Sequence, residues 1–169
     1  MNSNKTDLQN IQNISNKLTQ FFGEHLPITQ FMELDVEFYD GQTLILTAPL
    51  APSINDKQTA FGGSLYNVAV MACWGMVYLK TQEKGIQCNQ VVTEGSVKYI
   101  APVTGKLRAI CHAPNDEELS AFFNSFDETG KAKITLESII YDDEKILHVD
   151  PEIKPSVKFK GQYAILKTQ

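Results

Sequence analysis

The sequence has little positive charge of the kind that binds nucleic acid. Arg108 is the only arginine among 169 residues, and the formal net charge is −5. Proteins that bind nucleic acid use clusters of Lys and Arg to neutralise the phosphate backbone, so nucleic acid is excluded as an expected partner. An anionic ligand would have to be held by local groups rather than by the field of the whole protein.

Cysteine and histidine are also scarce. The three cysteines are an odd number without C-x-x-C spacing, which predicts neither a disulfide framework nor a zinc site. His25, His112 and His148 belong to separate predicted elements, so we expect no metal and no cofactor. The first thirty residues lack the apolar stretch of a signal peptide, and reduced thiols predict a cytoplasmic protein.

Charge is absent altogether between Lys57 and Lys80. A helix on the surface of a soluble protein needs a polar face, and this segment has none. The nineteen residues 61–79 would span about 28 Å as a helix, close to the thickness of a bilayer core. Three glycines and two polar residues interrupt the segment, however, and the amphipathic strands around it must be covered within the same domain. We therefore expect a sheet that curls around this helix rather than a membrane span.

The residues before this helix predict a helix and a hairpin. Apolar residues at helical spacing predict an N-terminal amphipathic helix over about 6–22, ended by Gly23 and Pro27. Asp40-Gly41 then predicts a hairpin with a type I′ turn, and residues 49–58 predict a loop. The strand before the turn alternates with period two, and its predicted buried side is Met32, Leu34, Val36 and Phe38.

The residues after the helix complete one predicted α+β domain over 1–169. Four further strands are predicted at 90–100, 106–113, 131–141 and 157–166. Alternation along 131–141 places five residues on one side: Ala132, Ile134, Leu136, Ser138 and Ile140. Asn115 and Glu118 have the spacing of a capping box, which predicts a helix before the strand at 131–141. The last two strands are separated by a predicted turn at Asp142-Asp143 and by two prolines, Pro151 and Pro155.

Two stretches resemble a known family. The stretch "LAPSINDKQTAFGGSLY" at residues 50–66, followed by a strand that carries "VKYIAPVTG", is similar to the putative thioesterase family of hotdog proteins. The final "VKFKGQYAIL" fits the last strand of that family, so the resemblance covers about 27–168. It implies a hotdog fold, in which an antiparallel sheet wraps around a long buried central helix. It also implies an acyl-thioester hydrolase that acts on acyl-CoA or acyl carrier protein.

The start of the uncharged helix has the groups that a thioester carbonyl needs. Backbone N–H groups near Gly62, Gly63 and Ser64 have no intrahelical partners, and the helix dipole adds positive charge there. The two glycines let a ligand approach the backbone closely, so we expect an oxyanion hole. An alternative stays open, in which Gly-Gly-Ser only turns the chain and caps the helix.

The sequence offers two candidates for the general base. Many hotdog thioesterases have a His before the two glycines and a carboxylate about two turns into the helix. Here Phe61 takes the His position, and no acid or His occurs from residue 62 to 79. Asn55 resembles the loop Asn that orients water or the thioester in such enzymes. We expect Asp56 to be the base, with Glu94 on the following strand as the other candidate; each has an exposed, solvated position as its alternative.

The sequence and the resemblance also lead us to expect a set of substrate-binding residues, a dimer and an alternative to enzyme function. We expect five residues to contact the substrate: Thr59, Phe61, Tyr66, Glu94 and Tyr99. Four cations are the candidates to lie near nucleotide phosphates: Lys57, Lys98, Lys106 and Arg108. Each has a solvated surface charge as its alternative. The β-rich strand at 90–100 is expected to pair with a second copy, which gives a homodimer or a dimer of dimers. Because the helical carboxylate is missing, a catalytically silent hotdog module that binds acyl thioesters or a protein partner remains the alternative to an enzyme.

Overall fold

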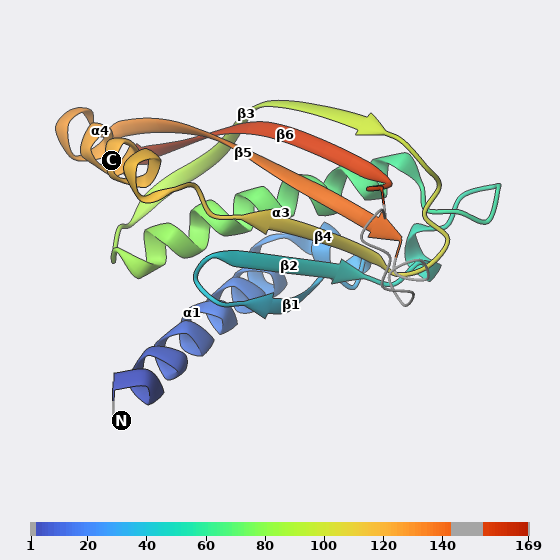
Figure 1. Ribbon diagram of the computed structural model, residues 1–169, viewed down its shortest axis with the longest axis horizontal. Coiled ribbons are helices and arrows are strands. Elements are labelled where there is room, and N and C mark those ends of the chain that lie inside the picture. Colours follow the sequence, from blue (N-terminus) through green and yellow to red (C-terminus); the bar gives the residue numbers. More distant parts are fainter. Residues whose placement is uncertain (1–2, 143–153, 169) are drawn as a thin grey trace.

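The computed structural model describes residues 3–142 and 154–168, with side chains from residue 11 onward. Six strands form one antiparallel sheet in the order β1-β2-β4-β5-β6-β3 (Figure 1). The strands are β1 (Asp35–Tyr39), β2 (Thr43–Ala48), β3 (Cys88–Tyr99), β4 (Leu107–His112), β5 (Lys131–Asp142) and β6 (Val157–Lys167). The helices are α1 (Ser3–His25), α2 (Pro27–Phe31), the 3-10 turn η1 (Ala51–Ser53), α3 (Gly62–Glu83) and α4 (Asp116–Thr129). Asp143, His148 and Pro151, for which the sequence made predictions, lie outside the described residues.

Helix α3, which is uncharged from residue 62 to 79, lies against one face of the curled sheet, so the predicted hotdog arrangement is confirmed. The sheet also holds the helix through its backbone. The Ser138 hydroxyl donates to the Ala69 carbonyl oxygen at 2.8 Å, and the Tyr163 hydroxyl donates to the Val70 carbonyl oxygen at 2.9 Å. Ser138 therefore belongs to the buried side of β5, as its alternation predicted. No helix among the described residues is long and apolar enough to cross a membrane.

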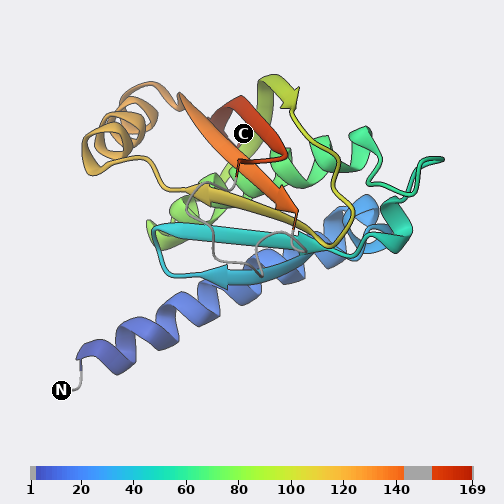
Figure 2. The same ribbon diagram turned by 45° about the vertical axis from the view of Figure 1, so that its right-hand side comes forward.

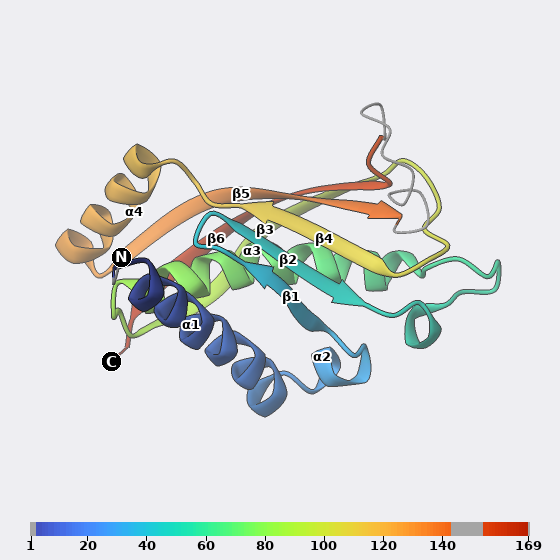
Figure 3. The same ribbon diagram turned by 60° about the horizontal axis from the view of Figure 1, so that its bottom comes forward.

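The N-terminal helix α1 covers part of α3 on the side away from the sheet (Figure 3). Leu18 and Phe22 are buried there, and a β-carbon at Gly75 would lie only 3.0 Å from Leu18 and from Leu44 of β2. Gly75 thus permits the close approach of the two helices. The N-terminal turns of α1 extend past the sheet (Figure 2). α1 continues through Gly23 and ends at His25, between the two residues, Gly23 and Pro27, that were predicted to end it.

One face of α3 is not fully covered. Four residues at helical spacing are only half-buried: Tyr66, Val70, Trp74 and Tyr78. They follow the edge of the sheet that β3 forms, where no further strand is paired in the described chain. The sheet that was expected to curl around this helix therefore leaves this stripe partly exposed.

The first hairpin differs from its predicted geometry. The pairing of β1 with β2 shifts between Val36 and Phe38, so that Tyr39 is buried and Phe38 is 45% exposed, the reverse of the prediction. The inserted residue, Glu37, pairs with Lys106 (3.2 Å) and Arg108 of the β4 side. Gly41 has a positive φ of 91°, but Asp40 does not, because its carboxylate accepts the N–H groups of residues 42 and 43 instead. The turn is present, and its predicted type I′ geometry is wrong.

The later elements lie where the sequence placed them. Asn115 and Glu118 form both hydrogen bonds of the predicted capping box at the start of α4. Gly130, with a φ of 73°, ends that helix in the left-handed conformation that glycine adopts at little cost. Alternation along β5 buries its predicted inner face, and β3 forms a long edge strand with almost all of its side chains exposed.

Candidate functional site

The loop before α3 is built around the side chain of Asn55. Its Oδ1 accepts hydrogen bonds from the backbone N–H groups of Lys57 (2.8 Å) and Thr59 (3.1 Å). Its Nδ2 donates to the Thr59 hydroxyl (2.9 Å) and to the Ala60 carbonyl oxygen (3.3 Å). A side-chain amide has two donor and two acceptor positions, and all four are used here. Asn55 and Thr59 therefore fix the shape of the loop.

The loop passes directly into the first turn of α3. Phe61 is the N-cap residue, with an extended backbone, and the first intrahelical bond runs from the Leu65 N–H to the Phe61 carbonyl oxygen at 3.0 Å. The N–H groups of Gly62, Gly63 and Ser64 precede that bond, so the helix offers them no acceptor. They carry the positive end of the helix dipole, which suits an oxygen that gains negative charge.

Aromatic side chains surround these N–H groups. The Phe61 ring lies against Gly63, since a β-carbon at Gly63 would be 2.5 Å from its Cε1 atom. The Tyr99 hydroxyl donates to the Gly62 carbonyl oxygen at 2.8 Å. Phe61 and Tyr99 are 58% and 51% exposed, so a ligand can reach both rings. Burial and the neighbouring Tyr66 raise the pKa of Tyr99, which keeps its hydroxyl protonated as a donor at neutral pH.

Tyr66 lies one turn further along α3, against the inner face of the sheet. A β-carbon at Gly95 would be 2.5 Å from the Tyr66 hydroxyl oxygen, so Gly95 leaves the space that Tyr66 occupies. The Tyr66 ring meets Phe159 edge to face, with ring centroids 5.5 Å apart. The sequence prediction missed Gly95, although a glycine inside a strand is a known sign of close approach.

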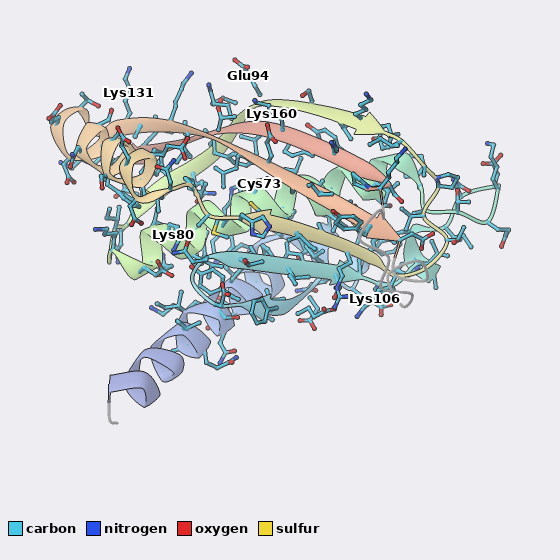
Figure 4. The ribbon with its side chains drawn as sticks, viewed as in Figure 1. Cys73, Lys80, Glu94, Lys106, Lys131 and Lys160 are labelled. Atoms are coloured by element: carbon cyan, nitrogen blue, oxygen red, sulfur yellow. The ribbon has the colours of Figure 1, made fainter. Side chains whose placement is uncertain are left out.

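The two candidate bases lie far apart on the molecule. The Asp56 carboxylate is 80% exposed at the loop tip and pairs with Lys57 at 3.2 Å. The pairing of β3 with β6 shifts between Val92 and Glu94, which places the Glu94 side chain on the outer face of the sheet. Figure 4 shows it pointing away from α3. Within one chain, Asp56 is therefore the candidate base that lies on the same side of the sheet as α3.

Three of the four expected phosphate-binding cations have carboxylate partners. Lys106 and Arg108 share the carboxylate of Glu37, and Lys57 pairs with Asp56. Lys98 differs, because it lies directly opposite Lys158 across the β3–β6 pair, where like charges repel each other.

The described residues offer no metal site, and two cavities lie beside α3. Among the described residues, no group of three or more His, Cys, Asp or Glu side chains could hold a metal ion. Two cavities lie toward the C-terminal end of α3. One, of about 670 Å³, lies between α3 and α4, and the other, of about 640 Å³, lies between α1, α3 and the start of β3. The sequence prediction missed the second cavity, because its residues come from three elements far apart in the chain.

The chain is similar to several known proteins. A crystal structure of a protein of unknown function from Chlorobaculum tepidum is 69% identical, with a TM-score of 0.88 over 94% of this chain and 97% of the other. A crystal structure of a putative thioesterase from Shewanella oneidensis is 28% identical, with a TM-score of 0.77 over 92% of this chain and 99% of the other.

The chain is also similar to a curated protein and matches a family model. The chain matches the protein transport protein SEC31 of Eremothecium gossypii at 25% identity, but it spans only 14% of that protein's length. The family model described as "Putative thioesterase (yiiD_Cterm)" matches residues 15–167, nearly the whole chain. The loop, the glycine pair and the buried helix described above all fall inside that range. The chain therefore belongs to this putative thioesterase family of hotdog proteins.

Proposed function

We propose that the protein hydrolyses acyl thioesters, with acyl-CoA or acyl carrier protein as the substrate. The observation that carries the proposal is the exposed first turn of α3, where Gly62, Gly63 and Ser64 offer N–H groups without intrahelical acceptors. Family membership and the similarity to a putative thioesterase support it.

The chemistry follows from this geometry. The thioester carbonyl oxygen accepts hydrogen bonds from the Gly62 and Gly63 N–H groups, which are fixed before the reaction begins. Water attacks the carbonyl carbon and loses a proton to a general base, and the negative charge moves onto the carbonyl oxygen. When the tetrahedral intermediate collapses, the carbon–sulfur bond breaks and the thiolate leaves and takes up a proton. Phe61, Tyr66 and Tyr99 line the approach of the substrate.

Asp56 is the proposed base, and Asn55 acts as a positioning residue. All four hydrogen-bonding positions of Asn55 are used within the loop, so it holds Thr59 and the chain leading to Gly62 rather than the substrate. Asp56 is next to it on the same loop. Glu94 faces the outer side of the sheet in its own chain, and we keep it as the second candidate because a partner subunit changes its surroundings.

We also propose that the enzyme is a two-fold dimer joined through β3. This strand has 12 residues, forms the edge of the sheet, and exposes 43% of Val91 and 39% of Val92. A long exposed edge strand is open to pairing with another strand, and a second β3 satisfies it. The half-buried stripe on α3 lies beside the same edge. Residues 1–169 form a single hotdog domain in this proposal, with α1 packed on α3.

We also propose a cytoplasmic location and a cation that attracts the phosphates of the acyl carrier. All three cysteines are free thiols, which supports a reducing compartment such as the cytoplasm. Lys98 lies beside Lys158 on the outer face of the sheet, and the other three expected cations have carboxylate partners. We propose Lys98 as the cation that attracts the phosphates of a carrier.

The alternative function is a silent module that binds acyl thioesters without hydrolysing them. One observation favours it: α3 has no acid or His between residues 62 and 82, where related enzymes place a carboxylate. A thiol-release assay across a panel of acyl-CoA thioesters separates the two. Hydrolysis by the wild type that Gly63→Val abolishes supports the enzyme, because the new side chain displaces Phe61 and blocks the first turn. Binding of the panel without thiol release supports the silent module.

A further inference from the structure

The connection between β3 and β4, residues 100–106, lies against the chain that leads into α3. Figure 1 shows this connection, the start of α3 and the C-terminal end of β5 at the same end of the molecule. Ala60 lies two residues before Gly62, and its N–H donates to the Val103 carbonyl oxygen at 2.8 Å. Together with the hydrogen bond from Tyr99 to Gly62, this contact holds the chain on both sides of Phe61. The position of the first turn of α3 therefore depends on where the connection lies.

The Asp142 carboxylate fixes the second half of this connection. Its Oδ2 accepts hydrogen bonds from the Thr104 N–H (3.1 Å) and the Thr104 hydroxyl (2.9 Å), and its Oδ1 accepts one from the Gly105 N–H (3.0 Å). Asp142 is the last residue of β5 and is only 1% exposed. A buried carboxylate is costly unless donors surround it, and hydrogen bonds to an ionised acceptor are stronger than neutral ones. Asp142 therefore ties the turn at Thr104 and Gly105 to the end of β5.

Val103 passes this constraint on to Ala60. It directly precedes Thr104, and its side chain is fully buried, so its carbonyl oxygen moves only if the turn moves. Ala60 is buried as well, and its carbonyl oxygen accepts a hydrogen bond from Asn55 Nδ2 at 3.3 Å. Ala60 is thus held at its N–H by the β3–β4 connection and at its carbonyl oxygen by the loop before α3.

The first half of the connection is held in a different way. The N–H groups of Ile100 (2.8 Å) and Ala101 (3.1 Å) donate to the Ser156 carbonyl oxygen, and the Ser156 N–H donates to the Ile140 carbonyl oxygen at 2.8 Å. These bonds use backbone groups alone, which many residue types could supply. The turn at residues 104–105 depends instead on the side chain of Asp142, so a substitution at this position tests the anchor.

We propose that Asp142 is a positioning residue that sets the position of the Gly62 and Gly63 N–H groups. It acts through the turn at residues 104–105 and the Val103 carbonyl oxygen. This inference rests on the proposed hydrolysis, in which the two N–H groups bind the oxyanion. Because the full negative charge forms only as water attacks, a displaced turn lowers kcat more than it raises KM.

Asp142→Asn tests the anchor with little change in shape. Asn has one acceptor oxygen, and its NH2 group would face an N–H donor of the turn. We expect kcat for thiol release to fall roughly ten- to a hundredfold with KM within about twofold, since a misplacement of about 1 Å can cost about a hundredfold. Ser138→Ala is the matched control, because this buried residue of β5 bonds the Ala69 carbonyl oxygen of α3 and not the turn. A wild-type kcat in Asp142→Asn, or an equal loss in Ser138→Ala, overturns the inference.

Thr104 gives a second test that does not disturb the core, because this residue is exposed. Thr104→Val removes the hydroxyl that bonds Asp142 and keeps the backbone N–H groups of the turn. We expect kcat to fall roughly two- to tenfold, as for one hydrogen bond. Thr104→Ser keeps the hydroxyl and should recover most of the wild-type kcat. A Thr104→Ser variant as slow as Thr104→Val counts against the inference, because the hydroxyl would then not be the cause.

Amide hydrogen exchange at Ala60, followed by NMR, tests the same anchor without turnover. We expect Asp142→Asn to speed exchange of the Ala60 N–H several-fold to about tenfold, as for a weakened hydrogen bond to Val103. Ser138→Ala should leave this exchange rate near that of the wild type. A wild type that releases no thiol refutes the proposed function, and the exchange rate then decides the inference alone. Unchanged exchange at Ala60 in Asp142→Asn overturns the inference whether or not the wild type is active.

Discussion

The Tyr99 hydroxyl donates a hydrogen bond to the Gly62 carbonyl oxygen at 2.8 Å, across 37 residues of sequence. This contact joins the last residue of β3 to the first residue of α3. β3 is the strand proposed to pair with a second subunit, and Gly62 begins the turn proposed to hold the oxyanion. We therefore expect a shift of the strand to change the position of the N–H groups that would bind the substrate.

Tyr99→Phe tests that connection. The substitution keeps the ring against Gly62 and removes only the hydroxyl. We expect kcat/KM for thioester hydrolysis to fall by about tenfold or somewhat less, since one neutral hydrogen bond contributes about 0.5–1.5 kcal/mol. Tyr141→Phe, on the outer face of β5, is the matched control and should keep the wild-type rate. Equal rates for both variants would show that Tyr99 does not position the turn.

Asn55→Ala tests the loop. Four hydrogen bonds are lost at once, so the chain from residue 55 to 60 should loosen. We expect the rate to fall by roughly ten- to a thousandfold, as for loss of a positioning contact worth roughly 1.4–4 kcal/mol. Trypsin should also cleave after Lys57 much faster than in the wild type. Asn124→Ala, on the exposed side of α4, controls for a general loss of stability. A lower rate without faster cleavage would mean that Asn55 contacts the substrate after all.

Much of the fold could be predicted because its signals are local. The lack of charge from residue 58 to 79 predicted that α3 is buried, and period-two alternation predicted the strands. The face of β1 could not be predicted in this way. The inserted Glu37 is held by Lys106 and Arg108, which lie about seventy residues later in the chain. A bulge that depends on such distant partners leaves no trace in the local pattern.

The same limit applies to the candidate site. The glycine pair and its free N–H groups follow from the start of a helix, so they could be predicted. The face of the sheet on which Glu94 lies could not be predicted. Gln90 faces α3, and simple alternation would place Glu94 on that same side, but the bulge between Val92 and Glu94 turns it outward and gives the inward position to Gly95. Asn55 was identified because it resembles the loop Asn of hotdog enzymes, and that resemblance does not reveal that its amide is fully bonded within the loop.

Two isosteric substitutions identify the general base. Asp56→Asn and Glu94→Gln each keep the shape of the side chain and remove its charge. If Asp56 is the base, Asp56→Asn should lower kcat by roughly a hundred- to ten-thousandfold with little change in KM, and Glu94→Gln should keep the wild-type rate. The measurement is a pH–rate profile of thiol release for each variant. A fully active Asp56→Asn beside an inactive Glu94→Gln would assign the base to β3, supplied across the dimer.

The contact between Gly95 and Tyr66 gives a prediction about stability. Gly95→Ala places a β-carbon 2.5 Å from the Tyr66 hydroxyl oxygen, so the ring must move or the strand must bend. We expect a loss of about 1–3 kcal/mol in the free energy of unfolding by urea, as for other overpacked sites. Tyr66→Phe removes the colliding oxygen, so the double variant should recover most of that loss. Additive losses in the double-mutant cycle would show that the two residues do not interact.

The exposed edge of β3 gives the last prediction, which concerns assembly. Val92 is 39% exposed on the strand proposed to pair with its copy, and pairing would bring the two copies of this residue close to the two-fold axis. Val92→Lys therefore places two positive charges near one another on a surface that should be buried, and like charges across paired strands are destabilising. We expect the wild type to be a dimer by light scattering at micromolar concentration, and Val92→Lys to be a monomer that has lost hydrolysis. Ile28→Lys is the matched control, because this residue of α2 is 51% exposed and lies away from β3; it should remain a dimer with full activity. A wild type that is monomeric, or a Val92→Lys variant that stays dimeric, would rule out pairing through β3. An active monomer would further show that one chain holds the complete site.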